Sequence, residues 1–582
     1  MAIRHLYIDG TNGFVGGLGD SWTRAMRTLP DLEDRISRLL EENPLDTQFV
    51  VHIRGAFAAH AVTALNLTIE LQGTSSIVIG QDVADMTVVD AGTVFTVNAA
   101  TEKHGLTNFV LTTAVVGVGY LGRILLLTDA AANVGTATIV DVNAGTNTIW
   151  CSLDTYPGWV IGGDVVTAQI LQPSVTGITG INISVERPGM GLAGGLAMTA
   201  LIGAIETDNL TVSGEGTIAI GPAMVTGAGS SLMIRSGSVL YFDSTVMSAN
   251  DVTSLVALGY LSAGANGFTS MGPNMTQGNL VCSDASAIIQ GYFSGVPTVI
   301  SEGSLGLRYA HSNGALASNG SLSILNCIVR NQVLLTSNSA LSFENITYGV
   351  LPAVGVSNGL VYVQSGKITN FTNVEGVNLP TGAPPGLLYG VHLDGPNSSA
   401  DGMELNDVRG QDGDLRIANG ARGSVAAWNI PPNPGLGPDI FVGDNSSVHF
   451  LGNVVKTATN PSAAFAANSV LEACRCSTVT QAPASNFTLP AGSGDHTTDY
   501  GANGALNFYR QTNVSLGVLT GAGGGTTNMA CSIRTGSSLS HGGAGIAGVT
   551  PIVIGGAAIA AWPGAVTTDI AAGIPELCTL YL

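Results

Sequence analysis

Polar turns followed by alternating apolar residues recur through the middle of the chain. The copies begin at Ser283, Ser301, Ser318, Ser337 and Ser357. Successive starts lie 18, 17, 19 and 20 residues apart, and in every copy Ser precedes Asp, Glu or Asn. Ser and Asp form turns by bonding their own backbone, and Asn tolerates positive φ. The apolar residues that follow alternate with polar ones, which is the period of a strand with one buried face. The pattern predicts one turn and one strand per copy over residues 283–370.

A turn and a strand that return at a slightly variable period are typical of a solenoid. Each coil pairs with the next at about 4.8 Å, and the turns tolerate changes of a residue or two. An antiparallel sandwich also has short strands and frequent turns, and it remains an alternative, but it gives no reason for the same phrase to recur. We therefore expect an all-β chain whose main body is a parallel β-helix, right-handed because parallel crossovers nearly always are.

The first 58 residues stand apart because they contain the clearest amphipathic helix of the sequence. Pro30 and Asp31 suit a first helical turn, and apolar residues at helical spacing continue to Asn43-Pro44. A strand with alternating apolar residues follows at 48–54. Because a β-helix has an open apolar end that such a helix can cover, we expect residues 1–58 to form a strand–helix–strand cap.

Turn clusters and changes of pattern divide the rest of the chain. Four strands between residues 106 and 171 predict a small antiparallel β-barrel inserted into the β-helix. The remaining expected divisions are first β-helix strands at 59–105, the main β-helix at 172–380, an irregular continuation with loops at 381–480, and a C-terminal β cap or assembly domain at 481–582.

The cap also carries a more specific pattern. It reads Tyr7-Ile-Asp-Gly-Thr-Asn-Gly13, then Gly19-Asp-Ser-Trp22, Ala25 and Thr28-Leu29. This pattern resembles the opening of pectate-lyase-like right-handed parallel β-helix proteins, which include virion proteins of tailed bacteriophages and bacterial surface proteins. The chain departs from that family at Phe14-Val-Gly-Gly, where acidic residues often follow, and this weakens the case for a calcium loop. The predicted barrel is similar to an insertion in virion β-helix proteins of tailed phages. The resemblance implies a virion role and a homotrimer.

Composition and charge exclude several classes of function. The net charge is −20 with only 20 Lys and Arg, so binding to nucleic acid through phosphates is not expected. The most apolar tract, 551–562, is shorter than the roughly 20 residues of a spanning helix, so membrane insertion is not expected either. The first residues lack the apolar core of a signal peptide. Seven irregularly spaced Cys and nine His form neither a disulfide framework nor a metal-binding pattern, and we expect no metal and no cofactor.

One acidic group and one serine motif are the candidates for chemistry. The acidic group comprises Asp394, Asp401, Glu404, Asp407, Asp412 and Asp414. Paired carboxylates at a fixed separation can cleave a polysaccharide, but the Gly-, Asn- and Ser-rich surroundings favour a solvated loop over 394–414, with a weak calcium site as an alternative. The segment 355–359 reads Gly-Val-Ser-Asn-Gly, the nucleophile-elbow pattern, but it lies in the fifth repeat copy with no helix after it. We interpret Ser357 as a turn residue and predict no catalytic residue.

Together these features favour a non-enzymatic structural component of a tailed-bacteriophage virion. It would be a head decoration or fibre, or a tail spike or fibre, with a part in host-surface attachment. The expected partners are capsid or tail proteins and further copies of the chain, with a trimer favoured, and a host-surface glycan is a candidate ligand. The chain would be made in the host cytoplasm and assembled onto the particle. A tail-spike polysaccharide depolymerase is one alternative, and a bacterial surface adhesin is a second.

Overall fold

The structure is a computed structural model of the 582-residue chain, which forms two compact units. The first contains Met1–Ala315 and Gly320–Ile328, and the second contains Leu316–Asn319 and Val329–Leu582. The described residues are 2–42, 47–70, 76–97, 106–111, 117–129, 132, 134–152, 165–186, 200–203, 205–214, 217–220, 224–225, 231–235, 239–240, 256–260, 274–275, 279–283, 286–293, 298–301, 303–312, 316–330, 332–337, 339–348, 359–375, 389–405, 413–428, 440–442, 446–450, 453–456, 463–465, 470–473, 478–481, 505–508, 513–516, 530–533, 538–541, 552–554, 557–559 and 579–581.

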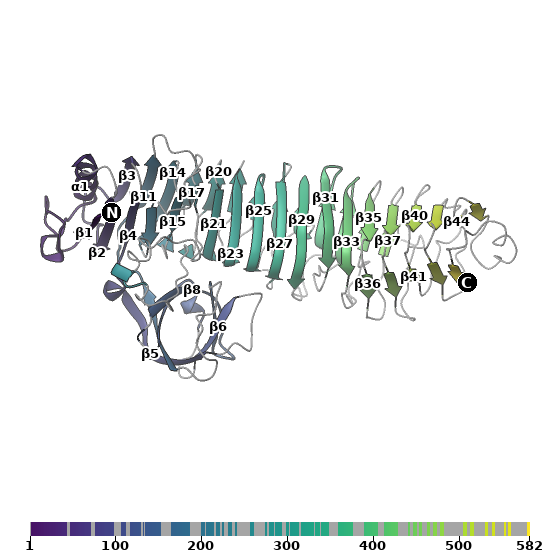
Figure 1. Cartoon of the computed structure of the whole chain (residues 1–582), viewed down its shortest axis with the longest axis horizontal. Helices are drawn as coiled ribbons and strands as arrows, with labels where there is room; N and C mark the ends of the chain where they lie inside the picture. The colour runs from purple at the N-terminus through teal and green to yellow at the C-terminus, as the bar shows by residue number, and fades with distance from the viewer. Residues whose placement is uncertain are drawn as a thin grey trace. The chain divides into compact units, whose positions relative to one another are not determined.

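Two parallel ladders run through the first unit (Figure 1). The first pairs in the order β1 (Ala2–Asp9), β2 (Thr47–Arg54), β4 (Ser76–Gly80), β12 (Ala200–Gly203), β15 (Thr217–Ile220), β18 (Val239–Leu240), β21 (Ser286–Phe293) and β23 (Ser304–Ser312). Short strands β13 (Glu206–Thr207), β16 (Met224–Val225) and β19 (Asn274–Met275) join it at β21, and β25 (Ser321–Val329) follows β23 and β24 in sequence. The second ladder is β3 (Ala64–Glu70), β11 (Gly180–Glu186), β14 (Asn209–Gly214), β17 (Ser231–Arg235), β20 (Asn279–Ser283) and β22 (Thr298–Ser301).

Consecutive strands alternate between these two ladders. The repeat copies at Ser283 and Ser301 lead into β21 and β23 of the first ladder, while β20 and β22 of the second ladder lie before them. Each copy therefore spans two strands, where the sequence pattern predicts one. The short second-ladder strands have too few residues to show an alternating pattern by themselves, which is why the repeat reveals only its longer half.

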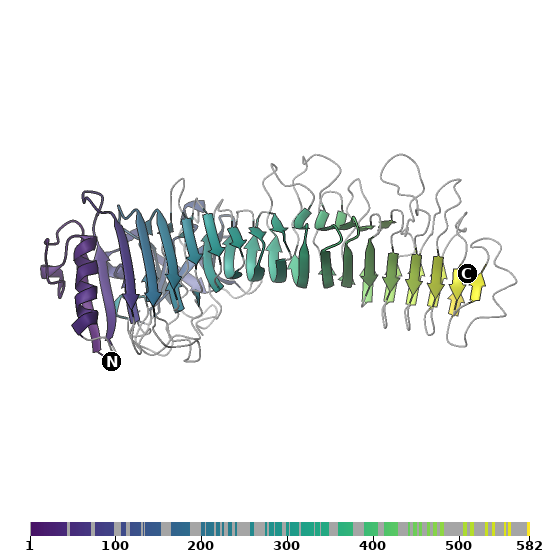
Figure 2. The ribbon, with the colours of Figure 1, turned by 90° about the horizontal axis from the view of Figure 1, so that it is seen from above.

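An amphipathic helix, α1 (Leu29–Glu42), lies beside the first strands of this unit, as Figure 2 shows. It begins with a capping box, in which the Asp31 N–H donates to Thr28 Oγ1 and the Thr28 N–H donates to Asp31 Oδ2, both at 3.3 Å. The helix packs against β3 with one apolar face. The buried residues of that face are Leu29, Leu32, Ile36 and Leu39. The predicted helix is therefore present, and its apolar stripe faces the end of the stack.

Six antiparallel strands between β4 and β11 close into a small barrel (Figure 1). They are β5 (Thr87–Val97), β6 (Thr107–Leu111), β7 (Ile124–Thr128), β8 (Val134–Asn143), β9 (Thr148–Cys151) and β10 (Val165–Gln172). Phe109, Leu125 and Ile139 lie in its fully buried core. The barrel begins at Thr87, earlier than the predicted 106, because β5 alternates in the same way as a strand of the stack and periodicity cannot separate the two.

The barrel interrupts the sequence without interrupting the ladders. After it, β11 pairs in register with β3, and β12 pairs with β4, the last strand before the barrel. On the outer face of the first ladder, Val50 and Val78 are buried beneath the barrel base, where Ile124 and Leu171 pack against them. Because the barrel covers the outer face here, this part of β2 and β4 carries apolar residues on both faces.

The second unit also consists of parallel ladders, three in number among its described residues. One pairs β27 (Ser339–Tyr348), β29 (Gly366–Glu375), β31 (Ser398–Leu405), β33 (Arg422–Trp428), β35 (Ser447–Phe450), β38 (Val470–Ala473), β40 (Ala505–Phe508), β42 (Ala530–Ile533) and β44 (Ile552–Ile554), with β45 (Ala557–Ile559) as an antiparallel end strand. Another contains β24 (Leu316–Ser318), β26 (Val333–Leu335), β28 (Gly359–Val363), β30 (Tyr389–Asp394), β32 (Gly413–Ala418), β34 (Ile440–Val442) and β37 (Ala463–Phe465). The third contains β36 (Asn453–Lys456), β39 (Thr478–Gln481), β41 (Asn513–Leu516), β43 (Ser538–His541) and β46 (Thr579–Tyr581).

Inward side chains of this unit stack in columns between neighbouring strands. Phe343 of β27 lies over Phe371 of β29 with ring centroids 5.7 Å apart, and both are fully buried. Two residues further on, Asn345 and Asn373 both have positive φ, 53° and 51°, and the Asn373 amide donates to Asn345 Oδ1 at 2.8 Å. Asn tolerates this left-handed conformation better than other non-glycine residues, which explains its recurrence at this position.

The all-β prediction with parallel strands is confirmed, and the strand pairings add two details. The fifth repeat copy, at Ser357, leads into β28, which belongs to a different ladder from β27; the strand that pairs with β27 is β29. Strands within 481–582 pair with strands before 481, as β40 does with β38, so the ladders continue where the pattern predicts a separate cap. The Gly-, Ala- and Thr-rich composition there blurs the alternation of the strands, so the sequence does not show that the ladders continue.

Candidate functional site

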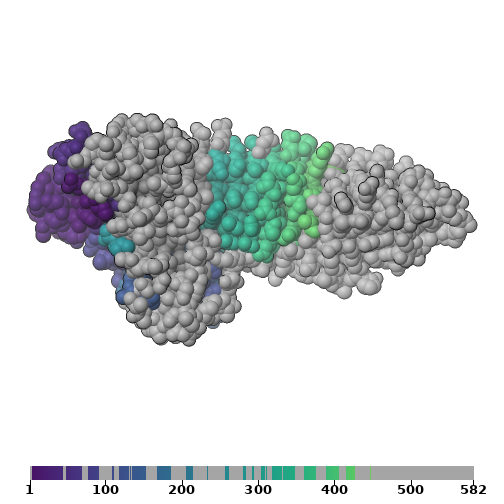
Figure 3. All heavy atoms as spheres, in the orientation of Figure 1, coloured from purple at the N-terminus to yellow at the C-terminus, as the bar shows by residue number. Residues whose placement is uncertain are grey.

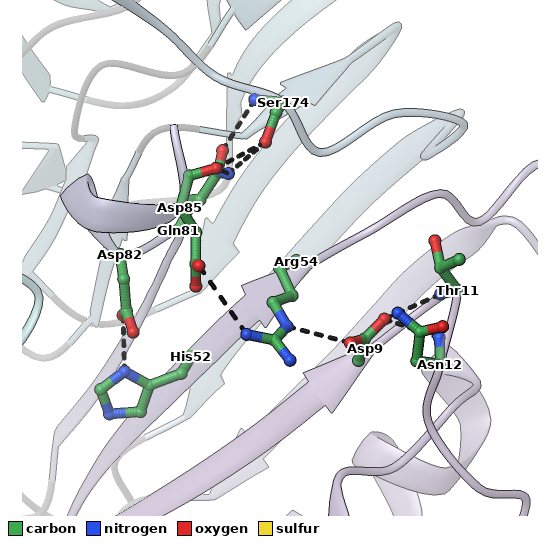
Figure 4. Close-up of polar contacts among 9 residues, drawn as sticks. All are labelled: Asp9, Thr11, Asn12, His52, Arg54, Gln81, Asp82, Asp85 and Ser174. Carbon is green, nitrogen blue, oxygen red and sulfur yellow. Dashed lines mark hydrogen bonds and ion pairs between the residues drawn. The ribbon is translucent and has the colours of Figure 1, made fainter. Parts of the chain in front are cut away.

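The best-defined group of polar side chains lies on the outer face of β1 and β2. Alternation along these strands turns Leu6 and Ile8 into the core and leaves the odd-numbered residues of β1 facing outward. The parallel register then places Tyr7 beside His52, and Asp9 beside Arg54. Figure 4 shows Arg54 reaching the Asp9 carboxylate and His52 reaching Asp82. Figure 3 shows the N-terminal residues, in purple, at the molecular surface.

Asp9 organises the Asp-Gly-Thr-Asn-Gly loop. Its Oδ1 accepts the backbone N–H groups of Thr11 at 3.0 Å and Asn12 at 2.8 Å, and its Oδ2 accepts Arg54 Nε–H at 2.9 Å. Burial raises the pKa of Asp9, but the bonds from Asn12, Arg54 and Thr11 together outweigh burial and leave that pKa below its ordinary value. The carboxylate already has three donors and a cation beside it, so the loop motif is explained by these contacts without calcium.

Arg54 joins three elements. Besides its bond to Asp9, its NH1 lies 3.7 Å from Asp85 Oδ1 in the short helix η2 (Val83–Asp85). Its guanidinium also lies 3.8 Å from the ring centroid of Trp22, in η1 (Trp22–Arg24), which is a cation–π contact. Trp22 in turn meets Tyr7 edge-on at 5.0 Å. One arginine therefore connects the N-terminal loop, the sheet and the segment that leads into the barrel.

A second chain of contacts runs through two histidines. His5 Nδ1 lies 3.0 Å from His52 Nε2, and His52 Nδ1 lies 2.6 Å from Asp82 Oδ1. The Tyr7 ring stacks on His52 with centroids 4.5 Å apart and an interplanar angle of 9°. His52 and Asp82 have the arrangement of a base and its orienting carboxylate, but the other ring nitrogen faces His5 and not a nucleophile. These contacts do not form a catalytic triad.

Gln81 and Ser174 connect the two chain segments that enter and leave the barrel. The Ser174 N–H donates to Gln81 Oε1 at 2.8 Å, and Gln81 Nε2 donates to the Asp85 carbonyl at 2.7 Å and to Ser174 Oγ at 2.5 Å. The Ser174 hydroxyl donates to the same Asp85 carbonyl, and the Tyr260 hydroxyl donates to the Gln81 carbonyl, both at 2.8 Å. Gln81 and Tyr260 are fully buried. We call Gln81, Asp85 and Ser174 the barrel clamp.

Replacing Gln81 with leucine should lower the local stability of the barrel clamp by about 2 kcal/mol. The substitution leaves the Ser174 N–H and one acceptor site of the Asp85 carbonyl without their partner in a partly buried place, where each such loss costs about 1 kcal/mol, the low end of the range for buried groups. Limited proteolysis should then cut near residues 81–86 and 173–175 faster than in the wild type. Equal cleavage rates in the two proteins would contradict a stabilising role for the clamp.

The acidic group predicted as a solvated loop is largely built into strands, so that interpretation is wrong for the described part of 394–414. Asp394 ends β30 and accepts bonds from the Tyr362 hydroxyl at 2.9 Å and the Asn419 amide at 2.6 Å. Asp401 and Glu404 lie in β31, and Asp401 forms an ion pair with Lys367. Gly402, with φ of 60°, marks a bulge within β31, and a bulge glycine resembles a turn in the sequence.

Of the other candidate residues, the structure describes one. Asp414 lies in β32, and Asp407 and Asp412 lie outside the described residues. Ser357 also lies outside them, two residues before β28 in the sequence. Across the described ranges, no group of three or more His, Cys, Asp or Glu is arranged to hold a metal ion. No helix in the same ranges is long and apolar enough to cross a membrane.

Comparison with known proteins gave two similar solved structures. No protein-family model and no curated protein matches the chain. The tailspike of Acinetobacter baumannii bacteriophage AP22, solved in complex with A. baumannii capsular saccharide, is 9% identical over 90% of this chain and 71% of its own, with a TM-score of 0.22. The tailspike of Pseudomonas phage LKA1 is 11% identical over 92% of this chain and 82% of its own, with a TM-score of 0.18. Both TM-scores are low, so neither likeness carries an argument about this chain.

Proposed function

We propose that the chain is a non-enzymatic structural component of a tailed-bacteriophage virion, built as a right-handed parallel β-helix. The observation that carries the proposal is the alternation of consecutive strands between parallel ladders in each unit. In that connectivity almost every strand is paired on both sides within its own chain, so few strand edges stay open. Such a stack suits a rigid part of a particle that works outside the cell.

Two features of the sequence and structure support a virion role over the alternatives. The loop motif whose resemblance points to virion β-helix proteins is held by Asp9 and Arg54, so the residues that carry the resemblance have a structural task here. A depolymerase would use carboxylates of the acidic group at 394–414. Two of them already have partners: Asp394 accepts a hydrogen bond from the Tyr362 hydroxyl, and Asp401 forms an ion pair with Lys367. A homotrimer and a host-surface glycan remain part of the proposal as partner and ligand.

Labelling of particles tests this function. Antibodies against the purified chain, applied to phage particles from lysed cultures of the source strain, should place gold label at one fixed location on the particle. Label confined to bacterial surfaces would contradict the virion role and favour an adhesin.

Light scattering of the purified chain tests the homotrimer and should give a mass three times that of one chain.

Enzymatic activity needs a separate test. Incubation of the purified protein with capsular and lipopolysaccharide preparations from the host should leave their chain lengths unchanged. If the wild-type protein shortens the polysaccharide and the Asp401→Asn protein leaves it at full length, the chain is a depolymerase that uses this carboxylate, and the structural proposal is wrong.

A further inference from the structure

His5 and His52, on the outer face of β1 and β2, face each other through ring nitrogens, and this contact survives only in some protonation states of the two rings. Asp82, as a carboxylate, only accepts, so His52 Nδ1 carries the hydrogen in the 2.6 Å contact. His52 Nε2 and His5 Nδ1 then face each other at 3.0 Å, a distance that needs one N–H and one lone pair. The N–H can belong to either ring, so the pair tolerates zero or one added proton. When both rings are cationic, two N–H groups point at each other and the contact is lost.

The contacts among His5, His52 and Asp82 link three elements of the first unit. His5 is in β1, His52 is in β2 and Asp82 precedes η2, so the three side chains tie both strands to the segment that leads into the barrel. The His52 side chain is only 5% exposed and is covered on one face by Tyr7. The buried His52 ring has no room to turn away while its neighbours stay packed, whereas His5 is an exposed residue of β1 and can turn outward when the contact is lost.

The surrounding charges do not offset a second proton on the pair. From β1 and β2, Asp9 and Arg54 face the site but bond each other, and from η2 Asp85 faces Arg54. From η1, Arg24 is paired with Asp20 at 3.0 Å. The neutral hydroxyls of Tyr7 and Tyr260 complete the surroundings, and both phenols have raised pKa values through burial and then the Asp82 charge. Among the residues that the structure describes, Asp82 is therefore the one carboxylate in direct contact with the histidine pair.

We propose that His5, His52 and Asp82 form an acid-sensitive latch, closed while the two imidazoles share one N–H and open once both are protonated. Opening breaks the side-chain link between β1 and the His52–Asp82 pair, while Arg54 still contacts Asp85 and β2 still pairs with β4. Burial lowers the pKa of His5, and the adjacent His52 lowers it further, with only partial compensation from Asp82. An open His5 takes up a proton near pH 6.5, and a closed one resists. Latch stability is therefore complete above about pH 6.5 and falls as the pH drops below it.

Hydrogen exchange measured by mass spectrometry tests the latch on the full-length chain. Peptides covering residues 2–9 and 81–86 should exchange faster at pH 5.0 than at pH 7.5 after correction for the chemical exchange rate. Because opening takes up one proton, the exchange rate should rise by at most about tenfold for each pH unit. Peptides from β14 and β17, which contain no histidine, should not change. An equal change in all peptides, or none in the latch peptides, would overturn the proposal.

Two histidine variants give the proposal a matched comparison. Gln at position 5 can accept or donate to His52 but cannot ionise, so His5→Gln should abolish the acid-dependent increase. His60→Gln is the control, because His60 bonds the Gly10 carbonyl outside the latch and should leave the increase intact. A His5→Gln protein that still shows the wild-type increase would refute the latch. Should His5→Gln fail to fold, NMR of wild-type protein with labelled histidine decides, because a His5 signal that titrates at or above pH 6.5 is incompatible with it.

Discussion

Arg54→Met is expected to lower the free energy of local unfolding at the N-terminal end by about 3 kcal/mol, the low end for breaking a buried ion pair because Arg54 is itself about one-third exposed. The change removes the cation beside Asp9, whose side chain is 3% exposed, along with the contacts to Trp22 and Asp85. Methionine keeps an unbranched apolar chain over the same surface. Native-state hydrogen exchange of β1 and β2 amides measures this local free energy directly.

The dependence of this loss on pH identifies its cause. Because the folded-state pKa of Asp9 is depressed, its stabilising contribution is complete above about pH 4 and disappears as the pH falls through that folded-state value. The difference between Arg54→Met and wild type should therefore narrow in acid. Arg38→Met is the control: Arg38 lies 3.8 Å from Asp34 in an ion pair that is about 70% exposed on both sides, and its loss should cost less than about 0.5 kcal/mol. A constant difference at all pH values would assign the loss to packing instead.

Gly13→Ala is expected to cost about 3 kcal/mol at the same end of the molecule. A Cβ on Gly13 would lie 2.2 Å from the Met26 carbonyl oxygen and 2.6 Å from the Asp9 carbonyl oxygen, both backbone atoms that cannot turn aside. The loop must then move away from β1, against the hydrogen bond between the Gly13 N–H and the Asp9 carbonyl. Hydrogen exchange of the β1 amides again reports the change.

Two other glycines separate crowding from backbone conformation. Gly16 has φ of 71° with no atom within 4 Å of an added Cβ, so Gly16→Ala should cost about 1 kcal/mol through conformation alone. Gly119 has open space and no positive φ, so Gly119→Ala should be close to neutral. If all three substitutions cost the same, close packing around Gly13 is not the reason for its presence.

The sequence predicts the strands and the helix well because their signals are local. Alternating residues in 48–54 and the helical spacing after Pro30 mark elements that the structure contains. What it could not supply was the assignment of strands to ladders. The phrase at Ser357 has the composition of its predecessors, yet it precedes a strand of the other ladder, and composition does not distinguish the two ladders. Short strands such as β22 and β24 carry too few residues for a periodic signal.

The polar site was missed for a different reason. Its members come from residues as far apart as Asp9 and Ser174, and the barrel insertion hides their proximity in the sequence. One signal was available: His52 and Arg54 are polar residues at alternate positions of an otherwise apolar strand, so they must share its outer face. Pairing β2 with β1 would then have placed them beside Tyr7 and Asp9. That register depends on tertiary structure, and the strand pattern by itself does not give it.

The barrel clamp has a consequence for how such a chain changes over time. Since Gln81 and Ser174 hold the two connections together, and β11 and β12 pair with β3 and β4 as if nothing stood between them, residues 87–172 behave as an interchangeable cassette. A different domain with equally close ends could replace the barrel without altering the register of a single strand. Such a replacement would also have to cover Val50 and Val78, which the base of the barrel buries on the outer face of the stack.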